Sequence, residues 1–133
     1  MSGYRNGADL ERAAKHHLED NGYYVIKSGG SKGVVDLAAF KPDHRLFVQC
    51  KLTGYLTPVE REALYALACQ LHAWPVVAKW EKIGTAARFV EFGRLVPHSE
   101  DFGAAPVVCP WSPDHGIADA HATARALPQG GIG

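Results

Sequence analysis

Two apolar runs of strand length, separated by a short polar connection, limit the fold of this chain more than any other feature. The runs cover residues 34–40 and 46–51, and Pro42-Asp43-His44 lies between them. Gly33 and Gly54 bound the pair. Strand-length apolar runs that flank a connection with Pro and Asp are typical of a β-hairpin. We therefore expect a hairpin around which the rest of the chain packs.

Three polar side chains interrupt this apolar hairpin: Asp36 in the first strand, and Gln49 and Lys51 in the second. Because side chains alternate between the two faces of a strand, Gln49 and Lys51 point the same way, about 7 Å apart along it. The loop length decides which residue faces Asp36. A four-residue loop that pairs Lys41 with Leu46 places Asp36 opposite Lys51, and a loop two residues shorter places it opposite Gln49. Every short loop therefore gathers an acid, an amide oxygen and an ammonium group.

The residues alone leave two interpretations of this polar cluster open. Burying such groups in an apolar sheet costs on the order of several kcal/mol unless something compensates, and a divalent metal ion is one candidate. The alternative is a cross-strand ion pair between Asp36 and Lys51, with Gln49 capping the edge.

A helix is predicted ahead of the hairpin. Leu10, Ala14 and Leu18 recur every four residues, which predicts an apolar stripe on a helix over residues 8–21. Glu11 lies next to that stripe, where an acid is ordinarily solvated and favours the helix dipole.

The order of the predicted elements defines the fold class. Thr57-Pro58-Val59-Glu60 is a capping box with Pro at the first helical position, and it starts a second helix. In chain order the expected elements are a helix, three strands, a helix and one or two strands, at residues 8–21, 23–27, 34–40, 46–51, 57–72, 75–80 and 87–92. This αβββαβ order predicts an α/β fold with a mixed central β-sheet flanked by helices on both sides.

Composition divides the chain at about residue 97. The whole chain holds 14 basic and 14 acidic residues, of which 13 basic and 10 acidic lie in residues 1–97. Residues 98–133 are rich in Pro, Gly and Ala and show no sustained periodicity. We expect one mildly basic domain at 1–97, which permits nucleic-acid binding without demanding it, and a loosely ordered or disordered extension at 98–133.

Cysteine usage and hydropathy favour a cytoplasmic protein. The three cysteines are scattered and show no CxxC spacing, which argues for reduced thiols inside a cell. We find no signal peptide, and no apolar run approaches membrane-spanning length.

A Gly-rich loop at residues 28–33 precedes the hairpin. The order Gly-Lys-Ser/Thr of a P-loop is absent, and the loop leads into a strand where a P-loop requires a helix, so we expect no nucleotide cofactor. Such an open loop can still present Ser31, Lys32 and backbone amides to a nucleic-acid phosphate.

Together these features resemble the PD-(D/E)XK nuclease fold and, within it, the archaeal-type and phage Holliday junction resolvases. The similarity covers about residues 5–97. The segments that carry it are Arg5-Asn6-Gly7, Glu11-Arg12, Gly22-Tyr23-Tyr24-Val25-Ile26-Lys27, Ser31, Asp36 and Gln49-Cys50-Lys51.

The resemblance implies a metal-dependent endonuclease that cuts branched DNA. Asp36 would be the main Mg²⁺ or Mn²⁺ ligand, with Glu11 and Gln49 beside it, and Lys51 would steady the attacking water or the charge that develops on the phosphate. Ser31 and Lys32 would lie near the scissile phosphate. Neighbouring phosphates would be held by Arg5, Arg12 and Lys27. Because two strands of a junction must be cut, the resemblance also implies a homodimer.

Gln49 departs from the usual pattern, which has an acid two residues before the lysine. An amide oxygen can bind a hard cation, but it brings no charge and cannot act as a base. Mrr-like restriction nucleases of the same fold also carry Gln-x-Lys. An endonuclease for linear duplex DNA and a catalytically inactive DNA-binding module are therefore alternatives.

Overall fold

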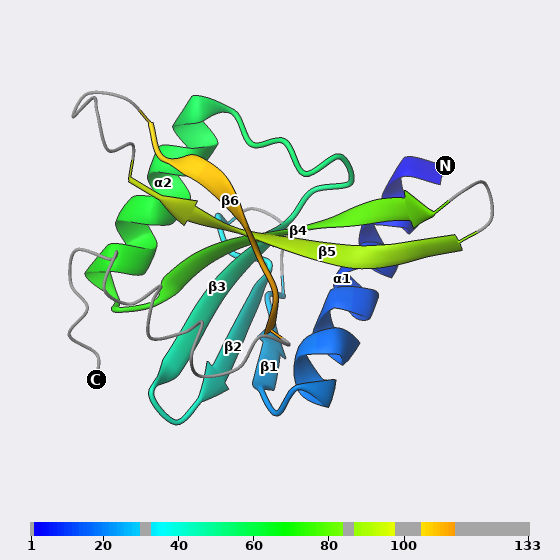
Figure 1. Ribbon diagram of the computed structural model, residues 1–133, viewed down its shortest axis with the longest axis horizontal. Coiled ribbons are helices and arrows are strands. Elements are labelled where there is room, and N and C mark those ends of the chain that lie inside the picture. Colours follow the sequence, from blue (N-terminus) through cyan, green and yellow to red (C-terminus); the bar gives the residue numbers. More distant parts are fainter. Residues whose placement is uncertain (1, 30–32, 84–86, 98–104, 114–133) are drawn as a thin grey trace.

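A six-stranded mixed sheet forms the centre of the fold (Figure 1). The structure is a computed structural model that describes residues 2–29, 33–83, 87–97 and 105–113. The strands follow one another across the sheet in sequence order, from β1 at one edge to β6 at the other. The elements along the chain are α1 (Ser2–Asp20), β1 (Tyr24–Lys27), β2 (Leu37–Lys41), β3 (His44–Cys50), α2 (Pro58–Gln70), β4 (Trp74–Ile83), β5 (Ala87–Val96) and β6 (Val107–Trp111).

The predicted hairpin is present as β2 and β3. These strands pair antiparallel and Lys41 lies opposite His44, so that only Pro42 and Asp43 form the loop. Asp43 has a positive φ of 67°, a conformation that Asp tolerates better than most residues. Helix α2 then carries the chain from β3 to β4, which pair in parallel. The other neighbouring strands are antiparallel, so the predicted mixed sheet is confirmed.

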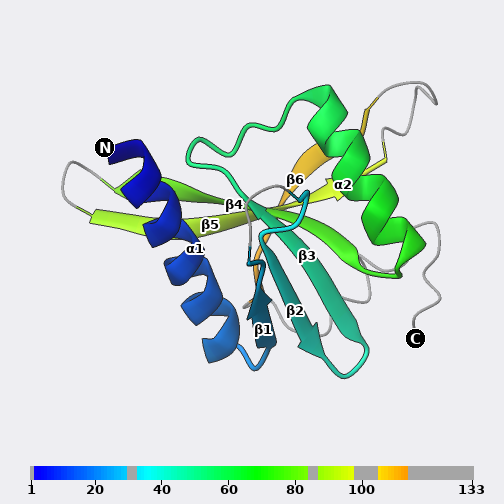
Figure 2. The same ribbon diagram turned by 180° about the vertical axis from the view of Figure 1, so that it is seen from behind.

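The two helices cover opposite faces of the sheet, as predicted. The apolar stripe of α1, Leu10, Ala14 and Leu18, is fully buried in the larger core cluster, which includes Val48 of β3. On the other face, Leu64 of α2 packs in a second cluster with Val77 of β4 and the partly buried Phe47 of β3. Phe47 precedes Val48, so its side chain points to the opposite face of the sheet. In the views from both sides, α1 and α2 lie well apart over the twisted sheet (Figures 1 and 2).

Helix α1 is longer than its apolar stripe indicates. It begins at Ser2, whereas the periodicity predicts a start at residue 8, because residues 2–7 carry no apolar repeat that would reveal them. Within the described part of the chain, no helix is both long and apolar enough to cross a membrane.

Strand β6 was not expected. It pairs with β5, and its last residue, Trp111, is only 8% exposed and packs edge-on against Trp74 and Phe92. Residues 107–111 therefore belong to the folded domain, which places structure beyond the predicted boundary at residue 97. Pro110 conceals the strand in the sequence, because proline is tolerated at a sheet edge but weakens a strand pattern. The rest of the predicted extension, 98–104 and 114–133, lies outside the described residues.

We expect Trp111→Ala to lower the free energy of unfolding by about 3–5 kcal/mol, because it removes a large aromatic side chain from the core. Val107→Ala, on the same strand but 38% exposed, should cost less than about 1 kcal/mol. Urea denaturation of the two variants measures the difference. Equal, small losses would show that β6 is not part of the core.

Candidate active site

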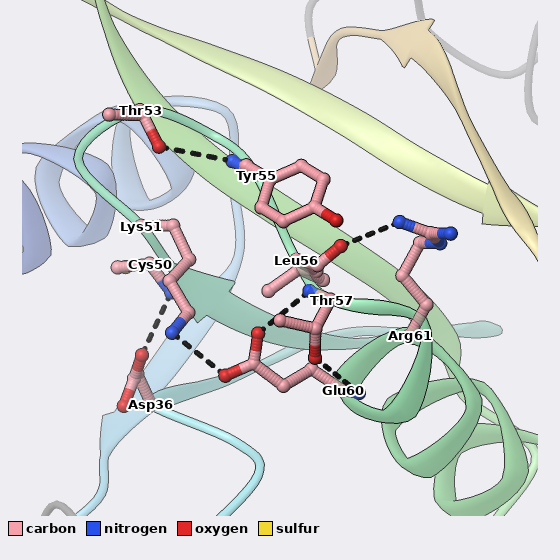
Figure 3. Close-up of polar contacts among 9 residues, drawn as sticks. All are labelled: Asp36, Cys50, Lys51, Thr53, Tyr55, Leu56, Thr57, Glu60 and Arg61. Carbon is pink, nitrogen blue, oxygen red and sulfur yellow. Dashed lines mark hydrogen bonds and ion pairs between the residues drawn. The ribbon is translucent and has the colours of Figure 1, made fainter.

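Asp36 lies directly before β2, next to the end of β3. The regular pairing of β2 with β3 ends at Leu37, which lies opposite Val48. The backbone N–H of Asp36 donates to the carbonyl oxygen of Val48 at 2.8 Å. The N–H of Cys50 donates to Oδ2 of Asp36, also at 2.8 Å (Figure 3). One hydrogen bond from the backbone of Asp36 and one to its carboxylate thus hold this residue against the end of β3.

The environment of Asp36 disfavours its ionised form. Burial raises the pKa of the Asp36 carboxyl group, and the Cys50 hydrogen bond and the charge of Lys51 offset this only in part. A carboxylate that is held in place without full electrostatic compensation is suited to bind a cation.

Gln49 lies at the same end of β3, one residue before Cys50. Its backbone pairs with Val77 of β4, so the residue lies on an interior strand. Oε1 of Gln49 is buried and has no hydrogen-bond partner. An unpaired buried amide oxygen is uncommon in folded proteins and calls for an explanation such as an ion. Amide and carboxylate oxygens are ligands for hard divalent cations, so the donor set fits Mg²⁺ or Mn²⁺.

Glu11 reaches the same region from α1. Burial raises the pKa of the Cys50 thiol, and the negative charges of Asp36 and Glu11 raise it further, so both acids lie near this residue. The side chain of Glu11 is 24% exposed, and its Oε1 lies 3.6 Å from Nζ of Lys27. Helix and hairpin therefore converge around Cys50. Across the described residues, however, no group of three or more His, Cys, Asp or Glu side chains could hold a metal ion.

Lys51 directly follows β3, and its ammonium group forms an ion pair with Glu60. Nζ of Lys51 donates to Oε2 of Glu60 at 3.0 Å, next to the Asp36 carboxylate (Figure 3). Oε1 of Glu60 accepts a 2.9 Å hydrogen bond from the N–H of Thr57 in the predicted capping box, which is present. The Thr57 hydrogen bond, followed by the one from Lys51, lowers the pKa of the Glu60 carboxyl group.

Sequence reasoning assigned Glu60 to the helix cap and missed its contact with Lys51. The available signal was the spacing. Glu60 lies in the first turn of the helix that follows Lys51 after a short loop, so the end of β3 and the start of α2 are close together.

The residues predicted to hold neighbouring phosphates are only partly described. Nη1 of Arg12 pairs with Asp9 at 2.8 Å along α1, and Lys27 pairs with Glu11. Such surface ion pairs are weak and can exchange for phosphate contacts. Arg5 lies in α1, but its side chain is outside the described set, and Ser31 and Lys32 lie outside the described residues altogether.

The fold and this arrangement of side chains define a class. An acid before one strand of a mixed α/β sheet and a Gln-x-Lys sequence at the end of the next are typical of a PD-(D/E)XK-type nuclease in which Gln replaces the second acid. A family model described as "Archaeal holliday junction resolvase (hjc)" matches residues 2–101. The chain belongs to this family.

Known relatives agree with this membership. The chain is 48% identical over 51 residues to "Crossover junction endodeoxyribonuclease Hjc" of Methanocaldococcus jannaschii, a match that covers 38% of each protein. The matched part thus spans just over a third of that curated relative. The structure of Hjc from Archaeoglobus fulgidus, a Holliday junction resolvase, superposes with a TM-score of 0.52 at 25% identity, over 65% of this chain and 70% of the other.

We expect Asp36→Asn to raise the melting temperature of the metal-free protein at pH 7. Burial raises the pKa of Asp36 in the folded protein above its ordinary value of 3.8. Ionisation of Asp36 therefore lowers the stability of the fold as the pH rises through this raised pKa, and this loss of stability is absent below pH 3.8. Asn keeps an oxygen for the Cys50 N–H and carries no charge. The gain should therefore shrink toward acid pH.

Thermal melts in chelator, from pH 7 down to below the ordinary pKa of 3.8, measure the difference in melting temperature between Asp36→Asn and the parent. Glu62→Gln, which removes an exposed carboxylate from α2, serves as the control and should melt like the parent throughout. A lower melting temperature for Asp36→Asn at pH 7 would contradict the electrostatic account of this site.

Proposed function

We propose that this chain is a Mg²⁺- or Mn²⁺-dependent endonuclease that cuts DNA at four-way junctions. Two observations carry the proposal: the half-buried, hydrogen-bonded carboxylate of Asp36, and the buried Oε1 of Gln49 that has no hydrogen-bond partner. Membership of the resolvase family supports the choice of a branched substrate. As the DNA substrate is inside the cell, the proposal includes a cytoplasmic location.

Asp36, Gln49 and Glu11 would hold the metal ion. When bound, a divalent ion polarises the phosphate and lowers the pKa of a bound water molecule. Asp36 contributes the anchored charge, Gln49 a neutral oxygen, and Glu11 a second negative charge from α1. Glu11 would have to exchange its contact with Lys27, 3.6 Å away, and a DNA phosphate beside Lys27 would favour that exchange.

Lys51 would act on the phosphate itself. Its ammonium group supplies a fixed positive charge near the point where negative charge develops on the phosphate oxygens. The Cys50 thiol, whose pKa is raised mainly by burial, stays protonated near neutral pH and adds no competing charge. Arg5, Arg12, Lys27 and Lys32 would hold the backbone on either side, and Ser31 would lie near the scissile phosphate.

A homodimer is part of the proposal. A four-way junction has two strands to be cut in near two-fold symmetry, and a symmetric pair of subunits presents two such sites. Two linked cuts per junction at related positions would follow from this assembly, whereas one subunit acting alone would leave single nicks.

We expect the parent protein to cut a labelled four-way junction in Mg²⁺ or Mn²⁺ but not in chelator. Asp36→Asn and Lys51→Ala should each slow cleavage by at least about 100-fold, because each removes a group that stabilises charge in the transition state. Junction affinity, measured in chelator, should stay within about threefold for both, since most of the affinity comes from phosphate contacts elsewhere. Asp20→Asn and Lys15→Ala, at the far end of α1, are matched controls.

The same assay separates the alternatives. Undiminished cutting by either site variant would remove the assignment of the site. Equal cutting of a matched linear duplex would indicate a duplex endonuclease. Binding without any cutting by the parent would indicate a catalytically inactive module.

A further inference from the structure

We propose that Glu60 is a positioning residue that holds the ammonium group of Lys51 in place for cleavage. The inference rests on the proposed nuclease function and assigns a role to a residue outside the Asp-Gln-Lys motif. It derives from one geometric fact, which is that a single carboxylate joins the cap of α2 to the lysine at the end of β3.

The Glu60 carboxylate is fixed from two directions. One oxygen accepts from the N–H of Thr57 at 2.9 Å, and the other accepts from Nζ of Lys51 at 3.0 Å. The N–H of Glu60 in turn donates to Oγ1 of Thr57 at 3.2 Å. A capping box ties both ends of the residue to the first turn of the helix, and the partial positive charge at a helix N-terminus favours an anion there. Glu60 therefore has little freedom to follow a moving partner.

Lys51, by contrast, needs an external constraint. Its backbone is held by hydrogen bonds from its N–H to Ala78 and from the Gly54 N–H to its carbonyl oxygen, both at 2.9 Å. The side chain is 34% exposed and extends over four flexible carbons. The hydrogen bond to Glu60 selects one of its many conformations, so the ammonium group reaches a defined point (Figure 3).

The neutral Gln49 makes this constraint more important. Asp36 is another anion near Lys51, because the charge of Lys51 offsets part of the rise in the pKa of Asp36, although the described residues include no direct Asp36–Lys51 ion pair. Without Glu60, the lysine would be drawn toward Asp36 and would compete for the carboxylate that is proposed to bind the metal. Glu60 balances that attraction and keeps the two groups apart.

Metal ligation by Glu60 itself is not supported by the geometry. Both oxygens of its carboxylate already accept hydrogen bonds, one from the N–H of Thr57 and one from Nζ of Lys51. Glu60 acts through the lysine, on the phosphate side of the site.

Glu60→Gln tests the proposal, because Gln also serves as the third helical residue of a capping box and removes only the charge that faces Lys51. We expect single-turnover cleavage of the four-way junction in Mg²⁺ to slow by about tenfold. Junction affinity in chelator and the melting temperature should stay close to those of the parent. In NMR spectra of the metal-free protein, the hydrogen-bonded Nζ signal of Lys51, assigned by its loss in Lys51→Ala, should disappear.

Two controls separate positioning from stability. Glu62→Gln removes a neighbouring charge on α2 and should cleave like the parent. Thr57→Ala weakens the cap by about 1 kcal/mol but leaves the Thr57 N–H and the lysine contact, so it should keep more of the cleavage rate than Glu60→Gln.

Parental cleavage by Glu60→Gln would overturn the proposal, and so would a loss of rate that Thr57→Ala reproduces. If the parent protein does not cut the junction, the proposed nuclease function is wrong, and Glu60 then has no role in cleavage. Persistence of the Lys51 signal in Glu60→Gln would show that the pair does not fix the lysine.

Discussion

The register of one hairpin determines where Asp36 lies relative to Gln49 and Lys51. Because Pro42 and Asp43 alone connect β2 to β3, the pairing places Asp36 beside the end of β3, where the Cys50 N–H binds its carboxylate at 2.8 Å. A shift of one residue would turn these side chains to the other face of the sheet. The larger fold protects the register, since α1 buries one face of the hairpin and α2 packs on the opposite side of the sheet.

This arrangement is unfavourable for the protein in the absence of a ligand. Burial raises the pKa of Asp36, and Oε1 of Gln49 is buried without a partner. Both features lower the stability of the fold, and the proposed cation would relieve both. Sites that work against stability in this way are commonly functional, because packing alone gives no reason to keep them. The neutral Gln49 lowers the charge available to a metal, so Glu11 and the helix-bound Glu60 have larger roles in the electrostatics of this site.

Local patterns predicted most of the fold. The four-residue spacing of Leu10, Ala14 and Leu18 gave the buried face of α1, and the capping box gave the start of α2. Two apolar strand faces correctly implied helices on both sides of the sheet. Local patterns could not choose the loop length, because Pro42-Asp43-His44 fits either a two-residue or a longer loop, and pairing across the sheet decides between them. They also missed β6, whose five residues are recognised by contacts with β5 rather than by periodicity.

In the site, too, local sequence patterns identify the residues, and the three-dimensional structure shows which of them are in contact. The motif residues Asp36, Gln49 and Lys51 stand out as polar groups in apolar strands, and the structure brings Asp36 and Glu11 near Cys50. The spacing along the sequence brings Glu60 close to Lys51, but the contact itself depends on the angle at which α2 begins after β3, which local patterns do not determine. The most direct measurement is an anomalous difference map from crystals soaked in Mn²⁺. The account predicts a peak bound by the carboxylate of Asp36 and Oε1 of Gln49, whereas a map with no peak there, or with Mn²⁺ held only elsewhere, would contradict it.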